Sequence, residues 1–460
     1  MRTFSIYTLG CKVNQYEGQQ IREFLERLGL HAAEPPLKPD LVVVNTCCVT
    51  HTASAKSRQY IRRAQKQSPE ALIVVCGCLP TVHIGELRIP AQNVQVVRDR
   101  SGLAVRLSHL VCDKAAAPVS RNTQSCPNIP IKAKNGFKIK HKNELDDNVT
   151  ELPPLTSFKG QTRAFLKIQD GCDGYCSYCI VPRTRPFVHS KPTDAVLREA
   201  QTLVESGHKE IVITGVFLGA YGQESVRRRN WPDQRNDRLA DLLDKVAQIP
   251  DLARIRLSSL EPGDVTPRLL EALCANRNIM PHLHLSLQSG SDAVLKKMGR
   301  QYGIDEFRQK VELIKSRLDR PAITTDIIVG FPGETDADFE RTVALAGDVG
   351  FARMHVFTFS PRPGTPAARS SNMVDSKIIR ARAHLLHDLG AELGREYRRQ
   401  FLGETAEILI ENDNGRVCGW SERYFRVNIE KSAKKPRKND LVRARLIDNC
   451  ESGMIGASEV

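Results

Sequence analysis

The densest group of reactive side chains is the stretch GCDGYCSYC, in which Cys172, Cys176 and Cys179 have the spacing C-x3-C-x2-C. Three thiolates on one tight loop can bind three irons of a cubane cluster and leave the fourth iron without a protein ligand. A structural zinc site usually has four protein ligands, so three cysteines without a nearby fourth ligand favour iron–sulfur over zinc. The spacing predicts a 4Fe–4S cluster with one open iron, and a zinc site or inert thiols are the alternatives.

A second set of cysteines lies far upstream. Cys11 occurs in LGCKVNQYE, Cys47 in VNTCCVTHTA and Cys78 in CGCLPT, each just after a predicted strand. Because the carboxyl ends of parallel strands gather at one edge of a sheet, these three thiols could converge there. Cys48 and Cys76 are expected to be structural, since successive residues of an extended backbone face opposite ways.

Short apolar runs alternate with amphipathic stretches around this second set. Strands are predicted at Thr3–Tyr7, Leu41–Val44 and Ala71–Val75, and helices at Tyr16–Leu28 and Ala53–Gln65. This alternation indicates an open α/β sheet, whose ligand-binding edge would carry the three cysteines.

The same alternation returns with a longer period between Arg163 and about Arg399. Six βα units in this stretch favour an α/β fold of the partial (β/α)6 barrel kind, with its active site at the carboxyl ends of the strands. Cys172 follows the first strand directly. The predicted strands are Ala164–Ile168, Glu210–Thr214, Arg254–Leu257, His282–Ser286, Ile323–Val329 and Arg353–Phe357.

The last segment, Gln400–Val460, has alternating strand-like pieces separated by Gly and Asn. Strands at Thr405–Ile410, Arg423–Ile429 and Leu441–Leu446 predict a small antiparallel barrel. A run of basic residues in this segment could follow a phosphate backbone. Its members are Lys431, Lys434, Lys435, Arg437 and Lys438.

Composition sets the wider frame for these segments. The chain of 460 residues carries a net charge of +14, which favours a polyanionic partner, and 13 cysteines, an odd number that argues against a disulfide framework. We see no apolar run of about 18 residues and no signal-like N-terminus, so no membrane association and a cytoplasmic location are expected.

A length of this order predicts about three domains. We expect an N-terminal domain at 1–110, a central domain at 156–399 and a C-terminal domain at 400–460. Residues 111–155 read as a basic linker, because Cys112–Lys142 holds seven Lys or Arg residues against a single acidic one, Asp113.

On the GCDGYCSYC loop the chain resembles the radical S-adenosylmethionine (SAM) superfamily, and the three upstream cysteine motifs resemble those of its methylthiotransferase family. The resemblance covers essentially the whole chain, including a C-terminal RNA-binding barrel of the TRAM type. It implies SAM and two 4Fe–4S clusters as cofactors, one cluster on each cysteine set. The downstream cluster would cleave SAM to a radical that removes a substrate hydrogen, and the upstream one would deliver the methylthio group.

The resemblance also assigns SAM contacts outside the cysteines. Tyr178 would lie against the SAM adenine, Gly215 in ITGVFLG near its amino group, and Ser286 and Gln288 in LSLQSGS near its ribose and carboxylate. Asp326 and Gly330 in TDIIVGFPGET would pass beneath the adenine. Loop packing is the alternative for the tyrosine, and ordinary turn formation is the alternative for the glycines.

Members of this family modify isopentenyl-adenosine or threonylcarbamoyl-adenosine in tRNA, or an aspartate of a ribosomal protein. The segments GCKVNQYE, TRAFLKIQDGC, CSYCIVP, HVFTFSPRPGTPA and GWSERYFRVNI most resemble the threonylcarbamoyl-adenosine branch. One departure is RTRPFVHS at Arg183–Ser190, where a Gly-containing basic turn would be more typical. A non-catalytic iron–sulfur protein that binds RNA is the rival outside the enzyme class.

The implied partners are a tRNA anticodon loop, an electron donor such as flavodoxin or ferredoxin, and a sulfur donor. Trp420, Tyr424 and Phe425 could stack on bases, with core packing as the alternative. Because the clusters lie upstream, truncation at about Gln400 is expected to weaken RNA binding and to spare SAM cleavage. The expected RNA contacts are Arg423, Arg426, Lys434, Lys435, Arg437 and Lys438.

Overall fold

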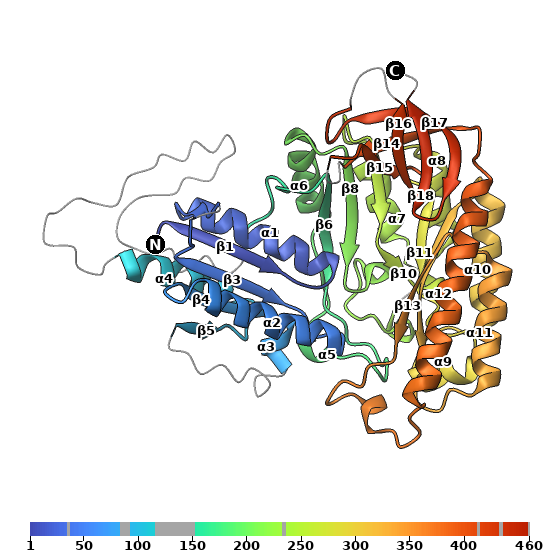
Figure 1. Ribbon diagram of the computed structural model, residues 1–460, viewed down its shortest axis with the longest axis horizontal. Coiled ribbons are helices and arrows are strands. Elements are labelled where there is room, and N and C mark those ends of the chain that lie inside the picture. The colour runs from blue at the N-terminus through green and yellow to red at the C-terminus, as the bar shows by residue number, and fades with distance from the viewer. Residues whose placement is uncertain are drawn as a thin grey trace, which may run out of the picture. The chain divides into compact units, whose positions relative to one another are not determined.

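The computed structural model describes residues 1–34, 37–82, 93–115, 152–231, 236–411, 415–431 and 436–458. Most of the expected basic linker, 116–151, lies outside these residues, as do Lys434 and Lys435. Internal contacts divide the chain into two compact units, which are treated separately below (Figure 1). The first consists of Met1–Gly10, Glu17–Cys47 and Ala53–Pro154, and the second of Cys11–Tyr16, Cys48–Thr52 and Leu155–Val460.

The N-terminal sheet is open and entirely parallel, in the order β2-β1-β3-β4-β5. The sequence prediction of an open α/β sheet is therefore confirmed, although two short edge strands, β2 and β5, were not foreseen. The strands are β1 (Thr3–Thr8), β2 (His31–Ala32), β3 (Leu41–Thr46), β4 (Leu72–Gly77) and β5 (Val94–Val96). The helices are α1 (Lys12–Arg27), α2 (His51–Gln67), α3 (Cys78–Val82) and α4 (Leu103–Ala115).

The two central strands, β3 and β4, are buried along their whole length. Their sequences LVVVNT and LIVVCG are near-continuous apolar runs, as expected of parallel strands covered on both faces. On one face, Val43 and Val74 pack in a cluster with Leu25 of α1 and Leu107 of α4. This packing makes the sheet a rigid support for the loops at its carboxyl edge.

In the second unit, parallel strands lie at the six predicted positions. They are β6 (Arg163–Asp170), β8 (Glu210–Gly215), β9 (Arg254–Leu257), β11 (His282–Leu285), β12 (Ala322–Val329) and β13 (Arg353–Thr358). They form the sheets β7-β6-β8-β9 and β10-β11-β12-β13, where β7 (His189–Ser190) is an antiparallel edge and β10 is Ser259–Leu260. A parallel bridge from Ile255 to Ile279 links the two halves, so the partial barrel is confirmed.

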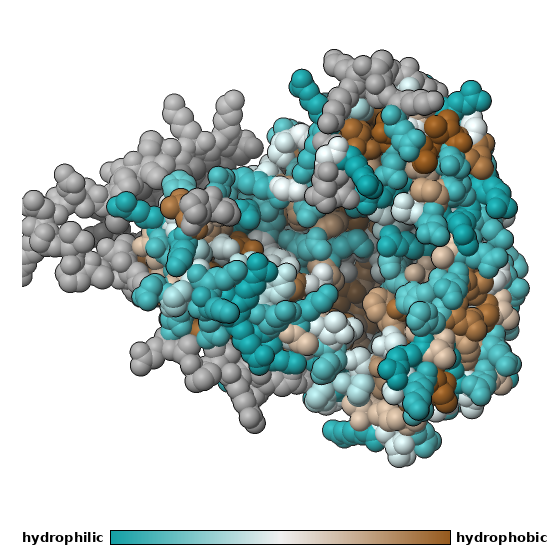
Figure 2. Space-filling model, in the orientation of Figure 1, coloured by the Kyte–Doolittle hydropathy of each residue, from teal (hydrophilic) through white to brown (hydrophobic). Residues whose placement is uncertain are grey.

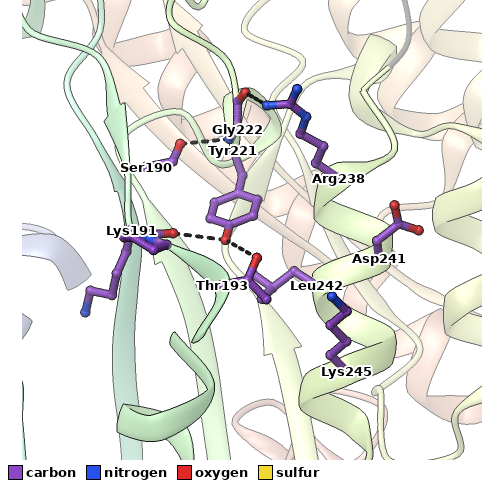
Figure 3. A pocket seen from close by; sticks show the side chains of 10 residues that line it. Ser190, Lys191, Thr193, Tyr221, Gly222, Arg238, Asp241, Leu242 and Lys245 are labelled. Atoms are coloured by element: carbon purple, nitrogen blue, oxygen red, sulfur yellow. Dashed lines mark hydrogen bonds between the residues drawn. The ribbon is translucent and has the colours of Figure 1, made fainter. Parts of the chain in front are cut away.

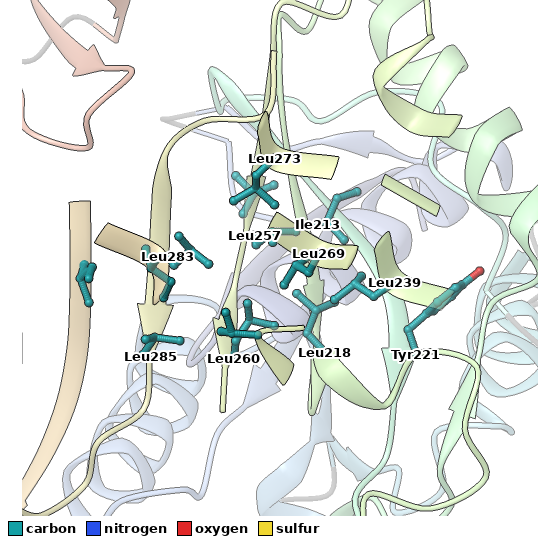
Figure 4. Packing of buried hydrophobic residues seen from close by; sticks show 14 of the residues in the cluster. Ile213, Leu218, Tyr221, Leu239, Leu257, Leu260, Leu269, Leu273, Leu283 and Leu285 are labelled. Atoms are coloured by element: carbon teal, nitrogen blue, oxygen red, sulfur yellow. The ribbon is translucent and has the colours of Figure 1, made fainter. Parts of the chain in front are cut away.

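Helices cover the outer side of these strands (Figure 1). Their buried faces meet alternate strand residues such as Leu257, Leu283 and Leu285, which pack with Leu269 and Leu273 of α8 (Figure 4). The helices are α5 (Val181–Thr184), α6 (Thr193–Glu205), α7 (Arg238–Ala247), α8 (Pro267–Ala275), α9 (Asp292–Met298), α10 (Ile304–Arg317), α11 (Asp336–Val349) and α12 (Ser376–Arg399), with short 3-10 turns η2 (Leu218–Ala220), η3 (Arg228–Asn230), η4 (Pro262–Asp264) and η5 (Pro366–Arg369).

The other side of the same strands, here called the inner face, is polar. Side chains alternate along a strand, so the residues between the leucines point away from the helices. A closed parallel barrel fills this space with branched apolar residues, whereas the inner face here is largely charged or hydrogen-bonding. Its polar members include Arg163, Lys167, Glu210, Thr214, Arg254, Arg256, His282, His284, Thr324, Asp326, Arg353 and His355.

The C-terminal strands close into a small barrel, in the order β14-β15-β16-β18-β17. They are β14 (Thr405–Ile410), β15 (Cys418–Ser421), β16 (Arg426–Lys431), β17 (Leu441–Cys450) and β18 (Gly453–Ser458). Two details differ from the prediction. The pair β16–β18 is parallel, and β16 begins at Arg426 instead of Arg423 because Tyr424 has a φ of 62° in a turn closed by the Ser421 N–H on the Phe425 carbonyl at 3.0 Å.

Two buried arginines join this small barrel to the amino-terminal ends of the parallel strands, here called the base. Arg254 donates to the carbonyls of Glu407 at 2.6 Å and Trp420 at 2.9 Å, and Arg256 donates to the carbonyl of Ser421 at 2.6 Å. Both arginine side chains are at most 1% exposed. The small barrel therefore satisfies charges that the parallel strands bury.

The face in Figure 2 is mostly hydrophilic, with apolar patches over the small barrel and the helical side. Helix α12 contributes two exposed apolar residues, Ile378 and Leu385. Within the described part of the chain, no helix combines the length and apolarity that crossing a bilayer requires.

Candidate functional site

The loop with Cys172, Cys176 and Cys179 leaves the carboxyl end of β6, where a parallel barrel carries its active site. Two close backbone approaches shape it. A Cβ at Gly171, whose φ is 79°, would lie 1.7 Å from the Phe187 carbonyl oxygen. A Cβ at Gly299, whose φ is 72°, would lie 2.7 Å from the Tyr175 carbonyl oxygen. Only glycine tolerates both constraints, so these positions hold the loop against its neighbours.

Each sulfur of this loop accepts a hydrogen bond. The Gly174 N–H donates to Cys172 Sγ at 3.4 Å, and the Val181 N–H donates to Cys179 Sγ at 3.4 Å. Arg300 Nη1 donates to Cys176 Sγ at 3.1 Å. Donors of this kind stabilise negative charge on sulfur, which is the form that binds iron.

The thiols lie close enough to influence one another. Burial raises the pKa of Cys172 to about 12. The hydrogen bond from the Gly174 N–H acts against this rise, and the negative charge of Cys176 adds to it. Burial and then the charge of Cys176 raise the pKa of Cys179 to about 12. Without a cation these groups would stay protonated at neutral pH, and a bound metal reverses that preference.

Whether the cysteine loop suits an iron–sulfur cluster depends on the donor atoms that it provides. No group of three or more His, Cys, Asp or Glu is already gathered as a metal site among the residues that the structure describes. The loop nevertheless has three thiols at one strand end, each with a hydrogen-bond donor, and no fourth protein ligand is needed for an iron that binds SAM. These residues fit a 4Fe–4S cluster, and their role as ligands stays a prediction.

Buried ion pairs surround the loop at this end of the strands, here called the mouth. Arg300 Nη2 lies 2.6 Å from Glu261 Oε1, and Arg228 bridges Glu261 and Asp264 at 3.3 and 2.7 Å. The side chains of Arg300 and Glu261 are each 7% exposed. Sequence reasoning missed this network. The paired arginines and carboxylates come from separate βα loops, so no local motif marks them.

Tyr178 lies beside these groups. Its ring packs edge to face against Phe331 with centroids 6.4 Å apart, and Arg300 Nη1 lies 3.4 Å from its hydroxyl. Burial raises the pKa of its phenol, with the charge of Arg300 opposing that rise. This position is consistent with both the adenine contact and the loop packing considered from the sequence.

The remaining expected SAM contacts lie at or near the carboxyl ends of their strands. Gly215 ends β8, and a Cβ there would lie 3.0 Å from Gln169 Oε1. Ser286 directly follows β11. Gln288 has a φ of 67°, and its N–H donates a hydrogen bond to the Asp326 carbonyl at 2.8 Å. Gly330 follows β12 with a φ of 75°.

Asp326 lies further inside its strand than the other expected SAM contacts, on the inner face of β12. Its carboxylate lies 3.3 Å from His284 Nε2. Burial acts to raise its pKa, but the hydrogen bond and charge of His284 outweigh that effect and lower it. All these SAM contacts stay predictions.

The upstream cysteines follow three neighbouring strands, as expected. Cys11 comes three residues after β1, and Cys47 and Cys78 come directly after β3 and β4. Cys78 Sγ accepts from Arg100 Nη2 at 2.9 Å, a contact that favours a thiolate. Cys76 packs in the hydrophobic cluster of the sheet, and burial raises its pKa to about 12. Convergence of the three thiols on a second cluster stays a prediction.

The expected RNA contacts differ in their surroundings. Arg423 donates to the Asp319 carboxylate at 2.9 Å and is 17% exposed, so its charge is committed within the protein. Arg426 Nη2 lies 3.0 Å from Cys418 Sγ. Arg437 and Lys438 are exposed. Of the aromatic candidates, Phe425 is 5% exposed in the core of the small barrel, which favours its packing interpretation.

A pocket of about 360 Å³ lies between β7 and α7, and its lining residues include no cysteine. It is lined by Tyr221, Thr193 and Lys191, with Arg238 and Lys245 at its rim (Figure 3). The Tyr221 hydroxyl forms hydrogen bonds with the Thr193 hydroxyl and with the Lys191 carbonyl. None of the expected cofactor contacts lines this pocket, so we do not assign the chemistry to it.

Family models match both halves of this arrangement. Residues 166–346 match the radical SAM superfamily, and residues 3–98 match uncharacterized protein family UPF0004. Among solved structures, the radical SAM methyltransferase TsrM of Kitasatospora setae, with tryptophan and a SAM analogue bound, has a TM-score of 0.52 at 14% identity, over 80% of this chain and 75% of that one. At this identity the likeness shows the fold alone.

Full-length relatives carry the assignment further. The threonylcarbamoyladenosine tRNA methylthiotransferases MtaB of Bacillus subtilis and Chlamydia pneumoniae are 35% and 36% identical, covering 93% and 99% of this chain and 90% and 97% of theirs. The tRNA-2-methylthio-N(6)-dimethylallyladenosine synthase of Pelotomaculum thermopropionicum is 31% identical over 91% of this chain and 89% of its own.

Proteins of this family use SAM and 4Fe–4S clusters, which fits the cysteine loop at the mouth. The identity and coverage of these relatives, the two family models and the partial barrel agree, and the chain belongs to the radical SAM methylthiotransferase family.

Proposed function

We propose that this enzyme methylthiolates tRNA, and that its substrate is N6-threonylcarbamoyladenosine next to the anticodon on its 3′ side, modified at C2. The observation that carries the proposal is similarity along nearly the whole chain to relatives named for that substrate, at 35% and 36% identity. Relatives named for dimethylallyladenosine tRNA are 31% identical.

The chemistry requires cofactors, because the C2–H bond of an adenine is beyond the reach of any side chain. When bound, SAM and the clusters supply one-electron chemistry and the methylthio group. The protein holds them: Cys172, Cys176 and Cys179 bind one cluster, and Cys11, Cys47 and Cys78 bind the other.

The other residues position SAM and limit side reactions. Tyr178, Gly215, Ser286, Gln288, Asp326 and Gly330 are proposed to contact SAM at the mouth. The ion pairs of Arg300 with Glu261 and of Arg228 with Asp264 hold charges fixed beside the cysteine loop, at 2.6 and 2.7 Å. Fixed charges in a dry site need little reorganisation during the reaction, and exclusion of water protects a reactive species.

The tRNA is proposed to be recognised in the cytoplasm through its phosphates and an unstacked anticodon-loop base. The net charge of +14 and the exposed Arg437 and Lys438 support this interaction. Arg426, Lys434 and Lys435 complete the proposed RNA contacts, whereas the ion pair of Arg423 with Asp319 makes that residue a weaker candidate. An electron donor such as flavodoxin or ferredoxin and a sulfur donor are also proposed.

The test is a direct comparison of substrates with the anaerobically reconstituted enzyme. Three reactions contain threonylcarbamoyl-adenosine tRNA, isopentenyl-adenosine tRNA or ribosomal protein, each with SAM and a reductant. Methylthiolation of the first is expected. Product only from the second or third would overturn the substrate assignment and leave the radical chemistry standing.

A further inference from the structure

The inner face of the partial barrel has a local excess of positive charge that the ion pairs do not neutralise. On the half formed by β6, β8 and β9, each of the charged groups is paired. Lys167 lies 2.7 Å from Asp170, Arg256 lies 2.9 Å from Glu210, and Arg163 lies 2.8 Å from Glu411. These cations are committed to protein carboxylates.

Strand β13 differs from that half. The side chain of Arg353 is exposed and has no hydrogen bond or ion pair within the residues that the structure describes. His355, two residues further on, is half-buried and lies on the same face, with its ring centroid 5.9 Å from that of His284. Phe357 follows in the same register and is 45% exposed.

These three side chains form a ladder, because alternate residues of a strand share a face and lie about 7 Å apart. Met354 and Val356, between them, face the hydrophobic cluster under the helices. The ladder thus presents a cation, an imidazole and an aromatic ring in one line. An exposed arginine and phenylalanine at the inner face are not needed for packing, which suggests a ligand.

The proposed substrate has matching chemistry. Threonylcarbamoyl-adenosine joins an aromatic base, through a ureido link at N6, to a threonine that bears a carboxylate and a hydroxyl. An arginine is the preferred partner for a carboxylate, and an aromatic ring is a natural surface for a base. We propose that Arg353 and His355 bind the carboxylate of the threonylcarbamoyl group and that Phe357 contacts its adenine.

Asp326 is the neighbouring group that could oppose this binding, since it pairs with His355 across β12 and β13. Its carboxylate lies 3.3 Å from His284 Nε2, on the side of β12 away from β13. The substrate also carries two hydrogen-bond donors, its threonine hydroxyl and its ureido N–H, and these need hydrogen-bond acceptors such as a carboxylate. Burial first and Arg353 second hold the pKa of His355 below its usual value, and a bound carboxylate would oppose the effect of Arg353.

The inference rests on the proposed function and separates this substrate from one with an uncharged isopentenyl group. A site built around a charged group discriminates strongly against an analogue that lacks it, because its own polar groups are left unpaired. Arg353 and His355 would therefore determine which adenosine is accepted, with little effect on the chemical step.

The test compares the reconstituted enzyme with its variants Arg353→Gln, Arg353→Lys and Arg353→Gln combined with His355→Gln. Arg308→Gln serves as the control, because Arg308 is an exposed arginine of α10 paired with Asp348 at 2.9 Å. The probes are one tRNA with threonylcarbamoyl-adenosine and the unmodified transcript of the same sequence. Affinity for each RNA, KM, kcat and iron content are measured for every protein.

We expect the double variant to lose about tenfold or more of the preference for the modified tRNA, as loss of a charged hydrogen bond implies. Its KM for the modified tRNA should rise by a larger factor than its kcat falls, its iron content should stay near that of Arg308→Gln, and Arg353→Lys should recover part of the preference. An unchanged preference in the double variant would overturn the inference alone. A wild-type enzyme without any preference for the modified tRNA over the unmodified transcript would overturn the proposed function as well.

Discussion

The two ends of the partial barrel use the same kind of interaction, a buried arginine beside a carboxylate, in different surroundings. At the base, Arg254 and Arg256 donate to main-chain carbonyls of the small barrel and lie against Glu210. At the mouth, Arg300 donates both to Glu261 and to the sulfur of Cys176. The base arginines therefore stabilise the fold, whereas the mouth arginine also acts on the proposed cofactor site.

Burial alone does not mark a functional residue in this barrel. Arg254 and Arg256 are more completely buried than Arg300, yet their hydrogen bonds and ion pairs are to structural carbonyls and carboxylates. The mouth differs because Arg300 contacts the thiol of Cys176, which is proposed to bind the cluster. Changes at the mouth should affect chemistry in a folded protein, and changes at the base should affect folding.

The largest effect is expected at the mouth. Cys176→Ala should abolish reductive cleavage of SAM, since two thiols cannot hold the three irons that leave one open. Replacing Cys172, Cys176 and Cys179 together should remove about half of the roughly eight irons expected per chain. Formation of 5′-deoxyadenosine and iron content are the measurements. Wild-type iron near four that Cys11→Ala left unchanged would contradict the presence of two clusters.

A second change separates the two cysteine sets. Cys47→Ala should still form 5′-deoxyadenosine but yield no methylthiolated product, because Cys47 belongs to the set proposed to deliver sulfur. Both products can be quantified in one reaction by mass spectrometry. Methylthio-adenosine formed at the normal rate would remove the sulfur-delivery role from the first unit.

At the base, Arg256→Ala should lower the free energy of unfolding by about 3–5 kcal/mol, because it leaves Glu210 buried with a weaker partner at 3.7 Å, Arg254. Arg268→Ala is the matched control, since Arg268 is 32% exposed and pairs with Asp241 and Asp244. The control should cost about 1 kcal/mol or less. Denaturant unfolding measures both, and equal losses would contradict the comparison.

The base also changes an expectation drawn from the sequence. Truncation at about Gln400 was expected to spare SAM cleavage, because the clusters lie upstream. Removing the small barrel would strip Arg254 and Arg256 of their carbonyl partners at 2.6 to 2.9 Å. Unpaired buried charges destabilise the rest of the barrel, so we now expect the truncated protein to fold poorly.

The smallest effect concerns RNA binding. Arg437→Ala should weaken tRNA affinity and reduce the slope of log affinity against log salt by about 1, as loss of one phosphate contact does. Arg423→Ala should leave that slope unchanged, since Arg423 is bound to Asp319 at 2.9 Å. Affinities at several salt concentrations test the pair, and a change of slope for Arg423 alone would reverse the two roles.

Much of the fold could be predicted because local patterns encode it. The six strands from β6 to β13 are apolar on the helix side and polar on the inner face, and LVVVNT and LIVVCG are typical of buried parallel strands. The cysteine loop has a local spacing that indicates its chemistry. The parallel pairing of β16 with β18 could not be predicted, because it depends on closure of the small barrel.

The ion pairs at the base and at the mouth could not be predicted from the sequence for the same reason. Arg256 and Ser421 are 165 positions apart, and Arg300 and Cys176 are 124 apart. No periodicity connects residues at such distances, and an arginine in a strand reads equally well as exposed. Arg423 was considered as an RNA contact because it lies beside Trp420, Tyr424 and Phe425, and its ion pair with Asp319 was equally invisible in the sequence.

The central claim, that this enzyme methylthiolates threonylcarbamoyl-adenosine in tRNA, is tested most directly by mass spectrometry of tRNA nucleosides from cells with and without the protein. The account predicts that 2-methylthio-N6-threonylcarbamoyladenosine disappears without the protein, that its precursor accumulates, and that a copy with Cys176→Ala does not restore it. An unchanged level of that nucleoside, with loss of the methylthio derivative of isopentenyl-adenosine instead, would contradict it.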